Sequence, residues 1–182
     1  LQDAKLWDEY NPNLYYGDVI LVVDGRQQRS GKITFGYRKI STSRYKIEIN
    51  DKPIFIRGNQ EAMGFPRTDH HPRDVETWRD IFRIYKSYGL TQVRFHSSCP
   101  PEAAFQAADE LGVYIMVELV WMTSINAKKD LRPISATAGI PQGLGTGDRT
   151  TDDFVYAETK RLLDEYGNHP SFAFFAFGNE LD

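Results

Sequence analysis

The chain has 182 residues, which is enough for one domain with a substantial core, or for one domain and part of another. Hydrophobic residues make up 41% and charged residues 26%, as in an ordinary globular protein, and the formal net charge of -3 argues against a basic nucleic-acid surface. No stretch approaches the roughly 20 apolar residues of a membrane span. We therefore expect neither a nucleic acid nor a membrane as a partner.

The cysteine count, the first residues and the aromatic content set further bounds. The single cysteine, Cys99, excludes an internal disulfide. The chain begins Leu1-Gln2 without an initiator Met, which indicates a piece of a longer protein, so the absence of a targeting signal says nothing about location. Aromatic residues reach 13%, a share that a large core explains and that would also suit the flat apolar faces of sugars.

The first part of the chain predicts β structure and no helix. Turn signals at Asp24-Gly25 and at Asn50-Asp51 separate runs that are continuously apolar or that alternate apolar and polar residues. The expected strands are residues 16–24, 33–38, 44–50 and 54–58.

From residue 54 onward, strands alternate with amphipathic segments of helical spacing. The first expected helix begins after Asp74 and ends before Gly89, and the second begins at Pro101 and ends before Gly112. A third is expected to start at Asp152 or Asp153, after a long insertion over about 121–151. The expected strands between and after these helices are 91–95, 113–117 and an aromatic run ending at 177.

This order, β-α-β-α-β-α-β, implies right-handed crossovers and a parallel sheet. We therefore predict an α/β fold that is the first half of a (β/α)8 TIM barrel, preceded by the last strands of an immunoglobulin-like β-sandwich. The predicted division is a sandwich part over residues 1–43 and a barrel part over residues 44–182.

Polar residues stand where the predicted parallel strands end. Because the C-terminal ends of parallel strands meet at one rim, these side chains are expected to converge there. Hydrolysis of a glycosidic bond needs one carboxylic acid to protonate the leaving oxygen and a second carboxylate as nucleophile or base. The candidates at the rim are Asn59, Arg94, His96, Glu118, Asn179 and Glu180, with Trp121 at the start of the long insertion.

Each charged candidate also has a structural interpretation. Glu180, after an aromatic strand, is suited to a general acid with a raised pKa, or it is a rim carboxylate paired with Arg94. Glu118 is interpreted first as a buried carboxylate that holds Arg94. Arg94 is an orienting cation, because its guanidinium cannot lose its proton. His96 binds a substrate hydroxyl or is a satisfied buried histidine.

Other motifs point less strongly to chemistry. Asp69, His70 and His71 invite a metal interpretation, but no third ligand follows at a useful spacing, so a solvated loop is favoured. Cys99 lies at a helix start, where a thiolate could be stabilised, but an inert thiol is favoured. The Gly-rich segment 139–147 lacks the residues of a phosphate-binding loop.

The order of these motifs resembles glycoside hydrolase family 2, the group of β-galactosidases, β-glucuronidases and β-mannosidases. Each motif is short, and their order and spacing along essentially the whole chain make the set specific. The segments are Leu6-Trp7, 11–15 (NPNLY), 35–38 (FGYR), 49–58 (INDKPIFIRG), Val93-Arg94, 108–112 (ADELG), 169–171 (HPS) and 178–180 (GNE).

The resemblance implies a retaining exo-glycosidase acting on carbohydrate, and it implies roles for four residues. Glu180 would be the general acid/base and Asn179 would contact the sugar 2-hydroxyl. Arg94 would help to hold the carboxylate of the nucleophile, and Glu118 would line the floor of the site. The nucleophile of such enzymes lies on the seventh barrel strand, which this chain does not contain.

Two departures from the family pattern bear on specificity. Many β-galactosidases of the family have Arg-x-Ser-His at the second strand, whereas residues 94–97 read RFHS. Family members that bind magnesium place a His where this chain has Val120. We therefore assign no metal and no cofactor.

The leading hypothesis is a β-galactosidase-like fragment that is inactive and poorly folded by itself, because half a barrel exposes two sheet edges. The alternatives are a non-catalytic carbohydrate-binding protein with a degenerate barrel and a metal-dependent barrel hydrolase. A homo-oligomer of the full-length enzyme stays open, and a parent that degrades polysaccharide is expected outside the cytoplasm.

Overall fold

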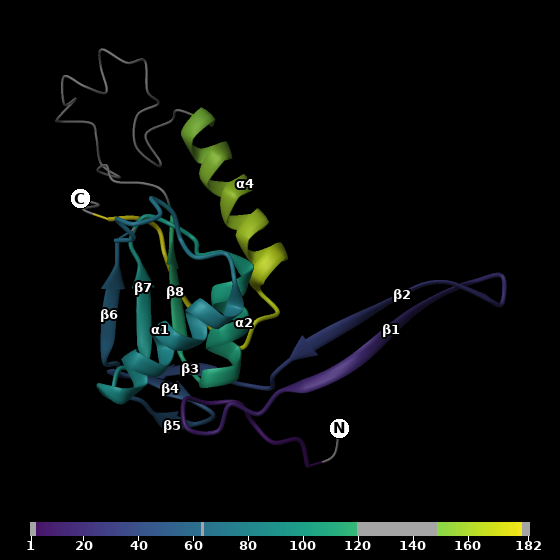
Figure 1. The fold of residues 1–182 in the computed structure, drawn as a ribbon, viewed down its shortest axis with the longest axis horizontal. Helices are drawn as coiled ribbons and strands as arrows, with labels where there is room; N and C mark the ends of the chain where they lie inside the picture. Colours follow the sequence, from purple (N-terminus) through teal and green to yellow (C-terminus); the bar gives the residue numbers. More distant parts are fainter. Residues whose placement is uncertain (1–2, 63, 120–148, 180–182) are drawn as a thin grey trace.

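A computed structural model describes residues 3–62, 64–119 and 149–179 of the chain. The described residues form three sheets and three helices, with a parallel sheet and its helices at the centre (Figure 1). The two smaller sheets are antiparallel and come first in the sequence. No helix of the described residues is long and apolar enough to cross a membrane.

The first sheet is a long hairpin of β1 (Tyr15–Val23) and β2 (Arg26–Phe35). Its tight turn at Asp24 and Gly25, with φ of 50° and 73°, is the one that the sequence predicts. The second strand starts earlier than predicted, because residues 26–32 are polar or small and give no apolar signal. The hairpin extends away from the rest of the molecule (Figure 1).

The second sheet has the order β3-β4-β5 and lies below the parallel sheet (Figure 1). Asn50 and Asp51, both with positive φ, form the predicted turn between its last two strands. The pairing of its first two strands crosses the predicted division between residues 43 and 44. Its strands are β3 (Ile40–Ser43), β4 (Lys46–Ile49) and β5 (Lys52–Pro53).

The predicted strand at 54–58 is wrong, because this segment passes from one sheet to the next. The backbone N–H of Ile54 still donates to the carbonyl of Ile47 in the antiparallel sheet, over 3.0 Å. The carbonyl of Arg57 already accepts from the N–H of Thr91 at the parallel sheet, over 2.8 Å. The first parallel strand, β6, therefore begins only at Gly58.

The central sheet is parallel, with the order β6-β7-β8-β9, and this agrees with the predicted alternation of strands and helices. Neighbouring strands in space are also neighbours in sequence, and a helix follows each of the first three. The strands are β6 (Gly58–Glu61), β7 (Gln92–Phe95), β8 (Tyr114–Glu118) and β9 (Phe172–Ala176).

Two of the three helices begin and end where the sequence predicts. In α1 (Val75–Ser87) the side chain of Asp74 accepts the N–H of Thr77 over 2.8 Å. In α2 (Glu102–Leu111) the left-handed residue Gly112 ends the helix.

The third helix starts earlier than predicted. Helix α4 (Arg149–Tyr166) begins at Arg149, so the predicted caps Asp152 and Asp153 lie inside it. A capping residue type in the sequence marks a possible start only, and the helix continues on its N-terminal side.

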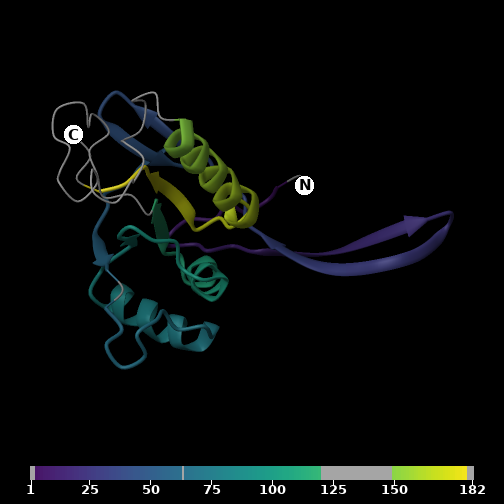
Figure 2. The ribbon, with the colours of Figure 1, turned by 90° about the horizontal axis from the view of Figure 1, so that it is seen from above.

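The helices cover one face of the parallel sheet (Figures 1 and 2). The main core lies between them and includes Trp78 and Phe82 of α1, Phe105 of α2 and Leu162 of α4. Alternate strand residues such as Val93 and Ile115, both 0% exposed, contribute to it.

A second core ties the N-terminal segment to the bottom of the parallel sheet. Trp7, Ile49 and Tyr114 are buried together there, and the indole N–H of Trp7 donates to the carbonyl of Asp109 over 2.7 Å. The guanidinium of Arg38 donates to the carbonyls of Pro170 and Phe172. These contacts place the N-terminal segment under the strands and leave the upper rim for a site.

Candidate functional site

The centre of the candidate site is an ion pair between two adjacent parallel strands. Arg94 of β7 approaches Glu118 of β8 with two nitrogens, Nε at 2.7 Å and Nη2 at 2.5 Å from Oε2. The side chain of Glu118 has no exposed surface, and that of Arg94 is 30% exposed. A charge buried this far is stable only when it is paired and hydrogen-bonded.

The same arginine reaches residues that belong to the outer strands of the sheet. Its Nη1 donates to Oε1 of Gln60 on β6 over 3.2 Å. Its Nη2 donates to Oδ1 of Asn179, which follows β9, over 2.8 Å. Arg94, which lies on β7, therefore joins side chains from β6, from β8 and from the segment after β9 at one rim.

The second oxygen of Glu118 is held by the turn after β7. The backbone N–H of Ser97 donates to Oε1 over 2.8 Å, and the Ser97 hydroxyl lies 3.3 Å from the same oxygen. Ser97 adopts φ of 48°, a left-handed conformation that is uncommon for a residue other than glycine. With both oxygens accepting hydrogen bonds, Glu118 is suited to fixing the site more than to exchanging protons.

Strand alternation decides which neighbouring side chains join this cluster. Gln60 pairs with Arg94 in the sheet register and shares its face, whereas Asn59 pairs with Val93, whose side chain is in the helix-covered core. The side-chain amide of Asn59 accordingly donates to the hydroxyl of Tyr85 on α1 over 2.8 Å. The structure does not bring the candidate Asn59 to the cluster.

Gln60 and Ser97 belong to this cluster and are not among the predicted candidates. The signal that could have found Gln60 is the period of two along a strand that starts at Gly58. The candidate His96 is half-buried in the turn after β7, where its backbone N–H donates to the carbonyl of Glu61 over 2.8 Å.

Two of the candidates, Glu180 and Trp121, lie outside the described residues, so their placement carries no part of this geometry. The Gly-rich segment 139–147 lies outside them as well.

The residues of the weaker motifs lie on the helix side of the sheet. The ring of His71 packs against Phe65, Trp78 and Phe95, and burial lowers the pKa of this imidazole. Burial raises the pKa of the Cys99 thiol to about 12, so the thiol is protonated at neutral pH. This agrees with the interpretation of Cys99 as an inert thiol.

Known proteins match the chain along nearly its whole length. A β-galactosidase of Vibrio vulnificus (strain YJ016) is 26% identical over 181 residues, which are 99% of this chain and 16% of that protein. A solved β-glucuronidase from Ruminococcus gnavus has a TM-score of 0.81 at 19% identity, over 99% of this chain and 28% of the other. A glycosyl hydrolase family 2 member from Bacteroides cellulosilyticus has a TM-score of 0.72 at 19% identity, over 98% and 21%.

The resemblance to glycoside hydrolase family 2 is confirmed. The solved structures, at this low identity, show the family 2 fold, and the sequence relatives carry glycosidase names. No family model matches the chain. The chain spans only 16% of the length of the Vibrio relative.

Proposed function

We propose that the chain is part of a retaining exo-glycosidase that hydrolyses O-glycosidic bonds and takes a carbohydrate as its substrate. The observation that carries the proposal is the side chain of Asn179, which Arg94 holds at the rim of the parallel sheet over 2.8 Å. Asn179 directly precedes Glu180 in the sequence. An amide fixed at the rim beside a carboxylic acid has the groups needed to bind a sugar hydroxyl and protonate a leaving oxygen.

In this proposal Glu180 is the general acid/base and Asn179 contacts the sugar 2-hydroxyl. Arg94 and the buried Glu118 act as positioning residues, because their ion pair and the Ser97 turn fix the amide of Asn179. His96 and Trp121 are proposed as contacts to the sugar. A nucleophilic carboxylate, supplied from outside this chain, would stand about 5–5.5 Å from Glu180 in a retaining enzyme.

The proposed architecture is the first half of a (β/α)8 barrel behind the end of an immunoglobulin-like sandwich. The parallel order of four strands, with helices on one face, supports the barrel part. The antiparallel β1-β2 hairpin, which stands apart from that sheet, supports the sandwich part. The proposed division into residues 1–43 and 44–182 passes between the paired strands β3 and β4, so in this proposal the two parts share the β3-β4-β5 sheet.

Of the two sugar classes that the relatives' names supply, we propose a β-galactoside as the first substrate to test and a β-glucuronide as the second. The sequence relative from Vibrio vulnificus is named a β-galactosidase, and the Ruminococcus gnavus protein was solved with a uronic isofagomine. The glycosidase names of the relatives do not favour the non-catalytic alternative.

The test is a Glu180→Gln variant of the full-length protein on nitrophenyl glycosides. Loss of the general acid is expected to lower kcat by about 100-fold to 10,000-fold. The loss of kcat/KM, which reports the first step, should be smaller with a dinitrophenyl glycoside, because a better leaving group needs less protonation.

A Glu165→Gln variant provides the matched control, since Glu165 is exposed near the end of α4. It should keep the activity of the parent. Parent-like turnover by Glu180→Gln would end the acid/base assignment. An equal loss of kcat/KM with both leaving groups would end it as well.

A further inference from the structure

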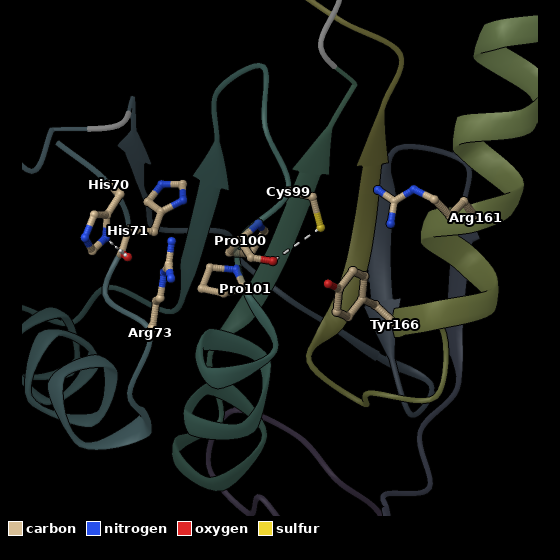
Figure 3. A pocket seen from close by; sticks show the side chains of 8 residues that line it. All are labelled: His70, His71, Arg73, Cys99, Pro100, Pro101, Arg161 and Tyr166. Carbon is tan, nitrogen blue, oxygen red and sulfur yellow. Dashed lines mark hydrogen bonds between the residues drawn. The ribbon is translucent and has the colours of Figure 1, made fainter.

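A pocket of about 330 Å³ lies on the helix side of the sheet, outside the rim cluster (Figure 3). Its middle is the start of α2 at Pro100 and Pro101. Arg73 and the two histidines lie on one side of these prolines, and Arg161 and Tyr166 of α4 lie on the other (Figure 3). Three separate segments therefore build the pocket.

The lining of this pocket is cationic. Among the residues that the structure describes, the lining has two arginines, which carry the charge, two histidines and no Asp or Glu. Among the described residues, Arg73 takes part in none of the ion pairs within 4.0 Å. Arg161 binds Glu158 through Nε and Nη2, so these bonds leave its Nη1 for another partner. An excess of positive charge in a concave site attracts an anion.

His71 contributes to the wall on the Arg73 side of the pocket. The Nε2 atom of His71 has no accessible surface and no hydrogen-bond partner in the structure. An atom that a water-sized probe cannot touch is also out of reach of an oxyanion oxygen, so the ring of His71 is part of the wall, packed against Phe65, Trp78 and Phe95. Helix α2 also starts at this wall without a side-chain cap, and the carboxylate of Glu102 in its first turn offsets part of the positive end of its dipole.

We propose that this pocket binds an oxyanion, a sulfate or phosphate group, carried by a sugar. Arg73 and Arg161 contact the oxygens from opposite walls of the pocket. A bare tetrahedral anion fills only a small part of 330 Å³. The pocket volume matches the lower end of sites for whole small molecules, about 300–1,000 Å³.

The test measures binding of glucose 6-sulfate, glucose and inorganic sulfate to the full-length protein by titration calorimetry. Glucose 6-sulfate is expected to bind and glucose is not. Arg73→Gln and Arg161→Gln should each weaken the sulfate ester by about tenfold or more, because each removes a charge-assisted hydrogen bond. His71→Phe keeps an aromatic ring among its neighbours and should weaken it less.

The control is Arg26→Gln, which removes the same charge from the exposed start of β2, on the hairpin. Binding should be unchanged in this variant, and glycoside turnover should be unchanged in Arg73→Gln. If Arg73→Gln weakens the binding of inorganic sulfate by the same factor as that of glucose 6-sulfate, the ligand is a free anion. This result would still support the oxyanion site. Equal affinity in the parent, Arg73→Gln and Arg161→Gln would overturn it, as would an equal loss in Arg26→Gln.

Discussion

At the scale of single residues, two Arg–Glu pairs of similar geometry differ in their surroundings. Arg79 pairs with Glu110 over 2.6 Å, much as Arg94 pairs with Glu118, but the side chain of Glu110 is 37% exposed and that of Glu118 is 0% exposed. Breaking a buried pair leaves an uncompensated charge away from water. We therefore expect Glu118→Gln to lower the free energy of unfolding by about 2–4 kcal/mol.

The comparison variant is Glu110→Gln, where water screens the arginine that is left behind. Its unfolding curve in urea should lie close to that of the parent. Glu118→Gln should also reduce turnover, because Arg94 then holds Asn179 less firmly. Equal urea midpoints for the two variants would contradict the assignment of Glu118 as a buried anchor.

The sequence allows most of this cluster to be predicted, because the ends of parallel strands meet at one rim whatever their side chains are. Arg94, Glu118 and Asn179 were expected to converge and do so. Asn59 and Gln60 were harder to assign, since shifting a strand by one residue moves every side chain to the other face. Only the start of β6 at Gly58 shows that the side chain of Gln60, and not that of Asn59, lies at the rim.

At the scale of secondary-structure elements, His169 joins the segment after α4 to helix α2. Its Nδ1 lies 2.6 Å from Oδ2 of Asp109 and its Nε2 lies 3.1 Å from Oε2 of Glu102. Burial alone would lower the pKa of His169, but the hydrogen bond and charge of Asp109, helped by Glu102, raise it above the usual value.

A raised pKa in the folded state means that the charged histidine stabilises the fold. This contribution is complete below the ordinary histidine pKa of about 6.5 and is lost as the pH rises through the higher folded value. The stability difference between the parent and His169→Gln should therefore be largest at pH 6 and shrink toward pH 9. Urea unfolding at several pH values measures it.

His70→Gln is the control, since His70 is exposed and lies outside this network. A pH dependence of stability in this control as large as that of His169→Gln would count against the network as its source. A difference for His169→Gln that stays constant or grows with pH would show that the ion pairs with Asp109 and Glu102 do not stabilise the fold.

The elements themselves follow from local signals where those signals are strong. Caps and apolar spacing predicted α1 and α2, and the turn residues predicted both hairpins. The predicted strand at 54–58 fails for a reason that local sequence cannot show. An apolar run fits any buried extended segment, and the structure divides this one between two sheets.

At the scale of the whole molecule, the β1-β2 hairpin exposes apolar side chains on both faces. The five consecutive residues from 19 to 23 are 45–57% exposed, although their side chains alternate between the faces. In the proposed architecture the rest of a sandwich covers them. An exposed apolar strand without such a cover pairs with other copies. The 182-residue chain by itself should therefore self-associate at micromolar concentration and should not turn over aryl glycosides.

Light scattering of this chain tests the source of the association. Val19→Lys combined with Leu21→Lys places two charges on one face of β1 and should lower the average mass toward the 20.9 kDa of a monomer. Gln28→Lys combined with Ser30→Lys adds the same charge to β2 without removing apolar surface, so it should leave most of the association in place. A parent chain that is already monomeric would show that the hairpin needs no cover. An equal effect of both double variants would show that net charge, and not the apolar strand, controls the association.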